Sequence, residues 1–333
     1  MQATTPEHAQ VRRSVLWDAV VVGAAAVDLW IRLPHIPEAD QVVLADRHRR
    51  EPGGSAANVA YRLAQLGARV AFAGRVGDDP EGALVLASLA EAGVGTALVR
   101  SIPGGRTAEA VVLVDRAGRK AVVALGGVAL LEDPSELPQE AYRTRTMYVG
   151  EAYPHVAEAI LRRCRTECVR TFYAPGLFAR QGLEVLRRTL QEADVVLLNA
   201  QEVTDLLGRR FEGVGALGQA LRRADLLGAW GAEEVVVTMG SQGAVILTES
   251  GYIEDPAPTI EVVDTTGAGD AFAAGYLWGV LQAWEPVRRL RFAQACAAVA
   301  ASGEGARWGR LAEPALLERC APTSEPEIQS GCS

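Results

Sequence analysis

Hydrophobic residues along the chain alternate between short continuous runs and longer stretches with helical spacing. Residues 17–23 (WDAVVVG) form a β-branched run typical of a strand buried on both faces. Residues 56–67 place apolar side chains every three or four positions and end at Gly67, and residues 81–93 repeat this pattern. Further strands are predicted at 69–74, 146–150, 169–173, 194–199 and 233–240. The alternation predicts an α/β fold with a doubly wound, mostly parallel central sheet flanked by helices.

Two segments, 29–51 and 100–126, interrupt this alternation. They contain short extended runs joined by turns with Pro and Gly, and neither shows helical spacing. Together they predict a small β-sheet at one edge of the main domain. The predicted division is a main α/β domain of 14–28, 52–99 and 127–320, a small sheet of 29–51 and 100–126, and flexible tails at 1–13 and 321–333.

Composition removes several classes of protein. A net charge of −8 and a pI of about 5.2 lack the basic footprint of a nucleic-acid-binding protein. No apolar run approaches the roughly 18 residues of a membrane helix, and the N-terminus has no apolar signal-peptide core. The five cysteines form no C-x-x-C pair. We therefore expect a reduced, cytoplasmic protein with a small-molecule substrate and neither nucleic acid nor membrane as a partner.

Lys120, the only lysine of the chain, excludes two common ATP-binding architectures. A Walker A loop needs a lysine after its glycines, and a protein kinase needs one on an early strand. Lys120 lies in a hairpin-like stretch and fits neither. If this chain uses ATP, it does so by another architecture.

The stretch 213–218 (GVGALG) satisfies the G-x-G-x-x-G pattern of dinucleotide-binding proteins. That pattern should follow a strand, and no strand precedes it here. The acidic pair at 233–234 begins a strand, so it cannot reach a ribose at the strand's carboxyl end. We expect a loop and a helix start there, and no NAD site.

Two polar motifs point to a polyol and a phosphate. Residues 53–60 (GGSAANVA) combine a glycine pair, which permits close approach of a ligand, with Asn58, whose amide can both donate and accept hydrogen bonds. Asp28 follows the first strand, on the side where open α/β sheets bind ligands. Residues 264–272 (DTTGAGDAF) place bare N–H groups and Asp270 at a helix start, where an anion would bind. A Ser-capped helix and a helix-end charge are the structural alternatives.

Two further motifs also follow predicted strands. In 199–202 (NAQE), Asn199 and Glu202 share one helical face and could turn toward a hydrated metal phosphate, although a capping box has the same spacing. In 238–243 (TMGSQG), a flexible turn could bind nucleotide phosphates or simply form a hairpin. An in-line phosphoryl transfer needs a hydroxyl holder, a metal, a nucleotide turn and an anion hole with a base, and the four motifs together supply them.

Over residues 16–320 the sequence resembles the ribokinase (PfkB) family of carbohydrate kinases, with the two family signatures at 53–82 and 264–279. The resemblance implies an ATP-dependent kinase with Mg²⁺ in which Asp270 is the general base and the N–H groups of Gly267, Ala268 and Gly269 form the anion hole. It also implies a lid, formed by the two irregular segments, that covers the substrate and often dimerises. The other implied site residues are Asp28, Gly53, Gly54, Asn58 and Glu151 for substrate, Asn199 and Glu202 for magnesium, Asn199, Thr238, Gly240, Ser241, Gly243 and Gln294 for nucleotide, and Asp264, Thr266, Ala300 and Gly305 for K⁺.

Departures from the family pattern bear on the substrate. Ser55 and Tyr61 stand where members that bind phosphorylated sugars carry Lys and Arg, so we expect a free sugar. Gly309 replaces a cation-site Ser, which leaves K⁺ dependence open. A nucleoside kinase is the alternative, with Trp30, Tyr173 or Phe178 lining a base slot, and a catalytically silent sugar-binding protein is a third possibility.

Overall fold

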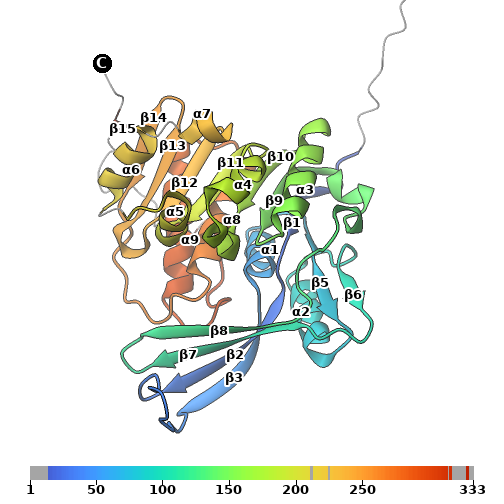
Figure 1. The fold of residues 1–333 in the computed structure, drawn as a ribbon, viewed down its shortest axis with the longest axis vertical. Coiled ribbons are helices and arrows are strands. Elements are labelled where there is room, and N and C mark those ends of the chain that lie inside the picture. Colours follow the sequence, from blue (N-terminus) through green and yellow to red (C-terminus); the bar gives the residue numbers. More distant parts are fainter. Residues whose placement is uncertain (1–13, 211–212, 224–225, 314, 317–327, 330–333) are drawn as a thin grey trace, which may run out of the picture.

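A computed structural model describes residues 14–210, 213–223, 226–313, 315–316 and 328–329. Its main feature is a sheet in the order β15-β14-β13-β12-β11-β10-β9-β1-β4, which is parallel from β4 to β12 and antiparallel from β13 onward (Figure 1). Its strands are β1 (Trp17–Val22), β4 (Val70–Ala73), β9 (Thr144–Gly150), β10 (Arg170–Ala174), β11 (Val195–Asn199), β12 (Glu234–Thr238), β13 (Ala244–Thr248), β14 (Gly251–Asp255) and β15 (Ile328–Gln329). The predicted doubly wound α/β class is confirmed.

Helices cover both faces of this sheet because its strands are apolar on both sides. Val21 of β1 packs into one core with the helices of one face, and Val20 packs into a second core with those of the other. Helices α1 (Ser55–Gln65), α2 (Pro80–Glu91), α8 (Ala268–Leu281) and α9 (Pro286–Ala301) form the first layer. The second layer consists of α3 (Pro154–Thr166), α4 (Leu183–Leu190), α5 (Ala200–Leu207), α6 (Val214–Arg223) and α7 (Leu226–Trp230).

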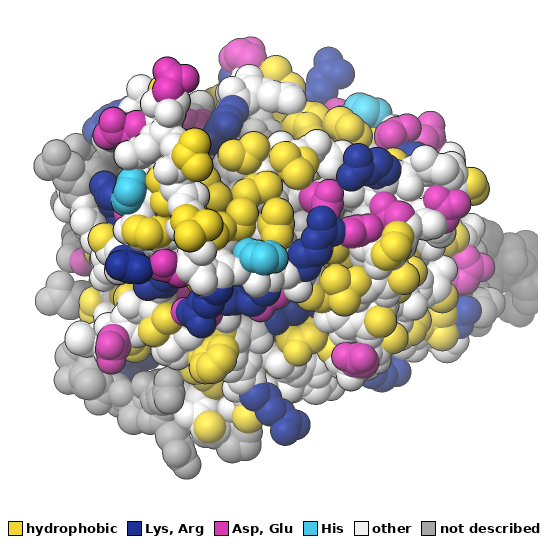
Figure 2. Space-filling view, turned by 90° about the horizontal axis from the view of Figure 1, so that it is seen from below, with side chains coloured by type: hydrophobic (Ala, Val, Ile, Leu, Met, Phe, Trp, Pro, Cys, Tyr) yellow, Lys and Arg dark blue, Asp and Glu magenta, His cyan; other side chains and the backbone are white. Residues whose placement is uncertain are grey.

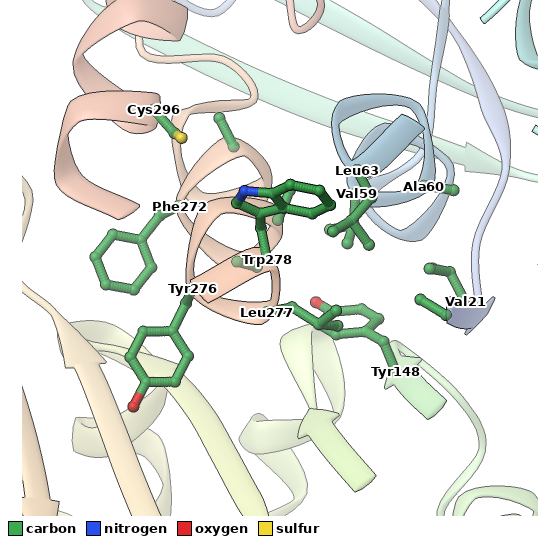
Figure 3. Close-up of a cluster of buried hydrophobic side chains, with 14 of the residues drawn as sticks. Val21, Val59, Ala60, Leu63, Tyr148, Phe272, Tyr276, Leu277, Trp278 and Cys296 are labelled. Atoms are coloured by element: carbon green, nitrogen blue, oxygen red, sulfur yellow. The ribbon is translucent and has the colours of Figure 1, made fainter. Parts of the chain in front are cut away.

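Packing between α1 and α8 fixes the two helix starts that carry the candidate chemistry. Figure 3 shows Val59 and Leu63 of α1 beside Leu277 and Trp278 of α8, with Tyr148 of β9 below them. The largely apolar α8 is buried around most of its circumference. Buried apolar area of this kind holds the two N-termini in a fixed relation.

A separate four-stranded sheet lies at the lower edge of the molecule in Figure 1, in the order β3-β2-β7-β8. Its strands are β2 (Ala26–Leu33), β3 (Arg47–Gly53), β7 (Ala108–Asp115) and β8 (Lys120–Gly126). Because side chains alternate along each strand, Asp28, Trp30 and Lys120 share one face, and Leu29, Val111 and Val123 share the other. We call this the small sheet, its Asp28 face the inner face and its Leu29 face the outer face.

The boundaries differ from the predicted ones in three places. The first strand of the small sheet begins at Ala26, so Asp28 belongs to the small sheet and not to the end of β1. Residues 100–102 form β6, which pairs with β5 (Arg75–Gly77) outside the small sheet. Within the predicted C-terminal tail, the two residues of β15 pair with β14. Residues 1–13 and the rest of 321–333 lie outside the described residues.

Short 3-10 helices complete the fold: η1 (Pro134–Glu136), η2 (Gln139–Tyr142), η3 (Gly176–Gln181) and η4 (Gly240–Gln242). The glycine-rich stretch at 213–218 starts α6, as expected for a helix start. Within the described part of the chain, no helix has the length and apolarity needed to cross a bilayer.

Candidate active site

The N-terminus of α8 is built from glycines for two different reasons. Gly267 has a φ of 75°, and a Cβ there would lie 2.4 Å from the Ala306 carbonyl oxygen, so both conformation and space require glycine. A Cβ at Gly269 would meet no atom within 4 Å, so this backbone faces open space. The Ala268 N–H donates to the Thr265 carbonyl at 3.2 Å. The predicted anion hole is thus open at Gly269, while its Ala268 donor is already used in a turn.

Asp270, in the first turn of α8, is held by the first turn of α1. Its carboxylate accepts hydrogen bonds from Ser55 Oγ at 2.7 Å and from Asn58 Nδ2 at 2.9 Å. Burial raises the pKa of Asp270, and the hydrogen bonds from Asn58 and Ser55 offset part of that rise. The two donors satisfy the carboxylate and fix its position between α1 and α8.

Asp28 reaches the same region from the small sheet. Gly53 leaves room for it, because a Cβ there would lie 2.4 Å from Asp28 Oδ2. Gly54 has a φ of 88°, and a Cβ there would lie 2.6 Å from Ala25 Cα. Burial, followed by the charge of Asp270, raises the pKa of Asp28 to about 6. The glycine pair therefore serves Asp28 and the turn into α1.

A cavity of about 190 Å³ opens beneath the start of α8, at the carboxyl ends of the parallel strands. Its predicted site residues are Glu151, Asn199, Glu202, Thr238, Gly269 and Asp270, and Ser55 also lines it. Glu151 has a φ of 46° and packs on Gly176, where a Cβ would lie 2.3 Å from its Cγ. Burial raises the pKa of Glu151 to about 7, with the charge of Asp270 adding to the effect. The cavity thus brings together Glu151, the two predicted magnesium residues and Asp270, whereas the other predicted substrate residues, Asp28, Gly53, Gly54 and Asn58, do not line it.

Asn199 and Glu202 form the capping box that the spacing allowed. Asn199 Oδ1 accepts from the Glu202 N–H at 2.9 Å, and Glu202 Oε2 accepts from the Asn199 N–H at 2.9 Å. Burial raises the pKa of Glu202 to about 7. The two residues therefore cap α5 and also line the cavity.

The turn 238–243 separates two cavities. Thr238 lines the first, and Met239 lines a second cavity of about 210 Å³ together with residues of α5 and α6 and Arg210. Gly240 has a φ of 57° with no neighbour for a Cβ, whereas a Cβ at Gly243 would lie 2.2 Å from the Asp255 carbonyl oxygen. Ser241 is exposed between them. Gln294, expected on the nucleotide side, is buried and donates to Asp255 Oδ2 at 2.8 Å, so its contact is with β14 and it lines neither cavity.

Three of the four residues expected at a K⁺ site come together through hydrogen bonds. Asp264 Oδ1 accepts from the N–H and hydroxyl of Thr266 at 2.9 and 2.6 Å, and Asp264 Oδ2 accepts from the Gly305 N–H at 3.0 Å. These bonds lower the pKa of Asp264 against the effect of its burial. Ala300 is buried in the last turn of α9. The bonds occupy the Asp264 carboxylate and tie the start of α8 to the loop after α9.

Comparison with known proteins decides the family. The pfkB family carbohydrate kinase domain matches residues 18–310. The chain belongs to the pfkB family of carbohydrate kinases. The ATP-dependent ribose-1-phosphate kinase of Halopiger xanaduensis is 35% identical over 281 residues, which cover 84% of this chain and 90% of that protein. The ribokinase of Arabidopsis thaliana is 27% identical over 294 residues, covering 86% of this chain and 76% of that protein.

Solved structures share the fold of this carbohydrate kinase. The structure of Arabidopsis thaliana ribokinase complexed with ribose and ATP has a TM-score of 0.81 at 24% identity and covers 92% of this chain and 99% of that one. The nucleoside kinase of Methanocaldococcus jannaschii has a TM-score of 0.75 at 22% identity, covering 92% and 99%. The predicted family, fold and sugar-kinase activity are confirmed.

Two arginines and a lysine near the start of α8 carry contacts that no motif in the sequence indicates. Arg62 of α1 donates to the carbonyls of Ala306, Trp308 and Gly309 at 3.1, 2.6 and 2.6 Å. Arg307 Nε donates to Asn58 Oδ1 at 3.0 Å, on the side of Asn58 opposite Asp270. Lys120 Nζ lies 3.4 Å from Thr266 Oγ1, so the only lysine reaches the start of α8 from the small sheet. No motif pointed to the arginines, because each works through loop carbonyls or through a side chain distant in sequence.

Proposed function

We propose that this kinase transfers the γ-phosphoryl group of ATP to a hydroxyl of a ribose-type sugar, with Asp270 as the general base. The observation that carries the proposal is the contact between Asp270 and Asn58 at the start of α8. A sugar held by Asn58 and Asp28 would present its hydroxyl to the same carboxylate. Asp28 and Asn58 can hold neighbouring hydroxyls through charged and neutral hydrogen bonds.

Burial makes Asp270 a stronger base than an exposed aspartate, because it raises the pKa of the carboxyl group. Ser55 and Asn58 hold the carboxylate in place, so the proton of the sugar hydroxyl has a fixed acceptor. As that proton leaves, the sugar oxygen bonds to the γ-phosphorus and the bond to the leaving diphosphate breaks. The backbone at Gly267 and Gly269, together with the α8 dipole, would stabilise the charge on the transferring group.

The nucleotide is proposed to lie along the turn 238–243 and the second cavity, on the opposite side of Thr238 from the sugar. Asn199 and Glu202 line the first cavity. Their oxygens accept the hydrogen bonds of the capping box, and the free lone pairs of the Glu202 carboxylate would accept from the water of a hydrated Mg²⁺ on the phosphates. Among the described residues, His, Cys, Asp and Glu form no group of three or more that could hold a metal ion. Bound Mg²⁺ would neutralise charge on the triphosphate. The Asp264 carboxylate is occupied by its hydrogen bonds, so we assign no step to K⁺.

A sugar fits the pocket better than a nucleoside does. Tyr173, one of three aromatic residues considered for a base slot, has no exposed surface and packs in the second core. The Trp30 ring is covered by the Arg49 guanidinium at 3.9 Å. Phe178 packs edge-on against Tyr153. The curated relatives described above act on ribose or ribose 1-phosphate by name, which supports a ribose-type substrate.

The small sheet is proposed to act as a lid and as a dimer interface. Its inner face carries Asp28, and its outer face carries Val123 and Leu125, which are 51% and 58% exposed. Figure 2 shows hydrophobic side chains gathered on the molecule as seen from the small-sheet side. A second copy would cover such a patch. The cytoplasm, where ATP and reduced cysteines coexist, is the proposed location.

Replacing Asp270 tests the proposal. Asp270→Asn keeps the shape and removes the proton acceptor, so turnover should be lost while ATP and sugar affinities stay within a few-fold. Steady-state turnover and equilibrium binding would be measured beside Asp46→Asn, a carboxylate that pairs with Arg116 on the small sheet. Turnover above about a tenth of wild type would remove Asp270 from the role of general base.

A further inference from the structure

Arg307, in the loop that follows α9, places its guanidinium against Asn58, which is hydrogen-bonded to Asp270. Arg307 Nε donates to Asn58 Oδ1 at 3.0 Å, and its Nη1 donates to Ser88 Oγ of α2 at 2.5 Å. The guanidinium also lies over the Tyr61 ring, 4.7 Å from its centroid. Nη2 is buried and has no hydrogen-bond partner among the described residues. The half-buried guanidinium is thus oriented by three contacts, while the N–H groups of Nη2 are unused.

The loop that carries Arg307 is held rigidly. Arg62, which has no exposed surface, donates to the carbonyls of Ala306, Trp308 and Gly309 on both sides of Arg307. Gly305 is tied to Asp264 by its N–H. Because the backbone on either side is fixed, the position of the guanidinium is set by the fold, as a binding group requires.

Unused N–H groups on a buried arginine are costly unless a partner is supplied. Burial lowers the pKa of Arg307 to about 10, so the side chain remains a cation at neutral pH. The charges of Arg307 and then Lys120 act to lower the pKa of Asp28 against the effect of its burial, and Arg307 Nε donates to Asn58 Oδ1. The site therefore contains positive charge next to the groups that would hold sugar hydroxyls.

We propose that Arg307 binds an anionic group of the substrate, so that the sugar phosphorylated by this kinase is itself a sugar phosphate. The inference rests on the proposed function, since it takes the sugar hydroxyl to lie at Asp270. Asn58 donates to Asp270 on one side and accepts from Arg307 on the other. One small sugar lying along Asn58 would present a hydroxyl to the base and a phosphate to the guanidinium. An arginine fork matches phosphate oxygens, whereas a neutral hydroxyl needs no buried cation.

An anionic subsite at Arg307 contradicts the expectation of a free sugar. That expectation relied on the absence of Lys and Arg from the first signature, at Ser55 and Tyr61. The guanidinium arrives instead from residue 307, and its stacking on Tyr61 brings it to the position in space where the signature lacks an arginine. Free and phosphorylated sugars are thus distinguished by a residue outside both signatures.

The test compares ribose with ribose 1-phosphate as acceptors in wild type, Arg307→Met and Arg307→Lys. Wild type should have the higher kcat/KM for ribose 1-phosphate. Arg307→Met should lower that value by about ten- to a hundred-fold more than the value for ribose, as expected when a charged hydrogen bond is lost. Arg307→Lys keeps the charge but not the forked guanidinium, so its ratio of kcat/KM for ribose 1-phosphate to kcat/KM for ribose should lie between those of wild type and Arg307→Met. Arg310→Met, an exposed arginine of the same loop, is the matched control and should leave the ratio unchanged.

A purely structural role for Arg307 makes a different prediction, because disordering Asn58 would reduce both acceptors by the same factor. An equal loss, or a wild type that prefers ribose, would overturn the anionic subsite while leaving the kinase proposal intact. If Arg307→Met does not fold, the wild-type preference between ribose and ribose 1-phosphate and the same ratio in Arg307→Lys still test the anionic subsite. Failure of the kinase proposal itself would be seen separately, as turnover that survives Asp270→Asn.

Discussion

Replacing Asp28 by Asn should make the ligand-free kinase more stable and less able to bind its sugar. Asp28 is a partly buried carboxylate with Asp270 nearby, and both conditions disfavour its charged form. Asn has nearly the same shape and no charge. The substitution therefore removes an electrostatic cost of folding together with a charged acceptor for sugar hydroxyls.

The size of the stability gain follows from the pKa. Folding raises the pKa of Asp28 from 3.8 to about 6, so the folded state holds the proton more tightly than the unfolded state. The contribution of Asp28 to the free energy of unfolding is therefore most favourable below pH 4 and falls as the pH rises to 6. About two pKa units correspond to about 3 kcal/mol as an upper limit, and the partial exposure of Asp28 reduces this to about 1 to 2 kcal/mol. Asp28→Asn should recover that amount at pH 8 and nothing near pH 4.

Denaturant unfolding of the ligand-free proteins at pH 4, 6 and 8 would measure the difference. Asp18→Asn is a control of opposite sign. Hydrogen bonds from Arg69 lower the pKa of Asp18, so removal of this carboxylate should destabilise the protein at pH 8. Kinetics should show a KM for the sugar raised by one to two decades in Asp28→Asn, with little change in the KM for ATP. An Asp28→Asn protein no more stable than wild type at pH 8, or a difference independent of pH, would refute the reasoning.

Two further predictions concern the metal and the assembly. Glu202→Gln should raise the Mg²⁺ concentration needed for half-maximal rate, because its carboxylate faces the cavity with Asn199; a Mg²⁺ titration that gives an unchanged midpoint with a raised KM for the sugar would place these residues elsewhere. Light scattering at micromolar concentration should give a dimer, and Val123→Glu on the exposed outer face of the small sheet should give a monomer, whereas a monomeric wild type would contradict the interface.

The order of strands and helices could be predicted because the spacing of apolar residues within one strand or helix depends on that element alone. The run at 17–23 alternates between two cores, and positive φ at Gly67 and Gly93 ends the first two helices as expected. Asp28 was placed at the end of β1 because the sequence does not show that the chain crosses to the small sheet at Ala26. A strand boundary of this kind depends on pairing with β7, where Ala26 pairs with Ala108, 82 positions later in the chain.

The candidate site was predictable where its residues are neighbours in sequence. Asp270 and the glycines before it belong to one helix start, so a short stretch of sequence is enough to place them together. Gln294 could not be placed, because its partner is Asp255 on a different element. Arg307 lies in a stretch without periodicity, and its contacts with Asn58 and Ser88 span more than 200 residues. Only tertiary structure reveals such a residue.

In the loop from 305 to 309, the backbone and the Arg307 side chain contact different parts of the site. The Ala306 carbonyl packs against Gly267, and the neighbouring carbonyls are held by Arg62, so the backbone supports the start of α8. The Arg307 side chain points instead to Asn58. If Arg307 binds the acceptor as proposed, a substitution at 307 changes which acceptor is taken and leaves in place the backbone that supports the start of α8.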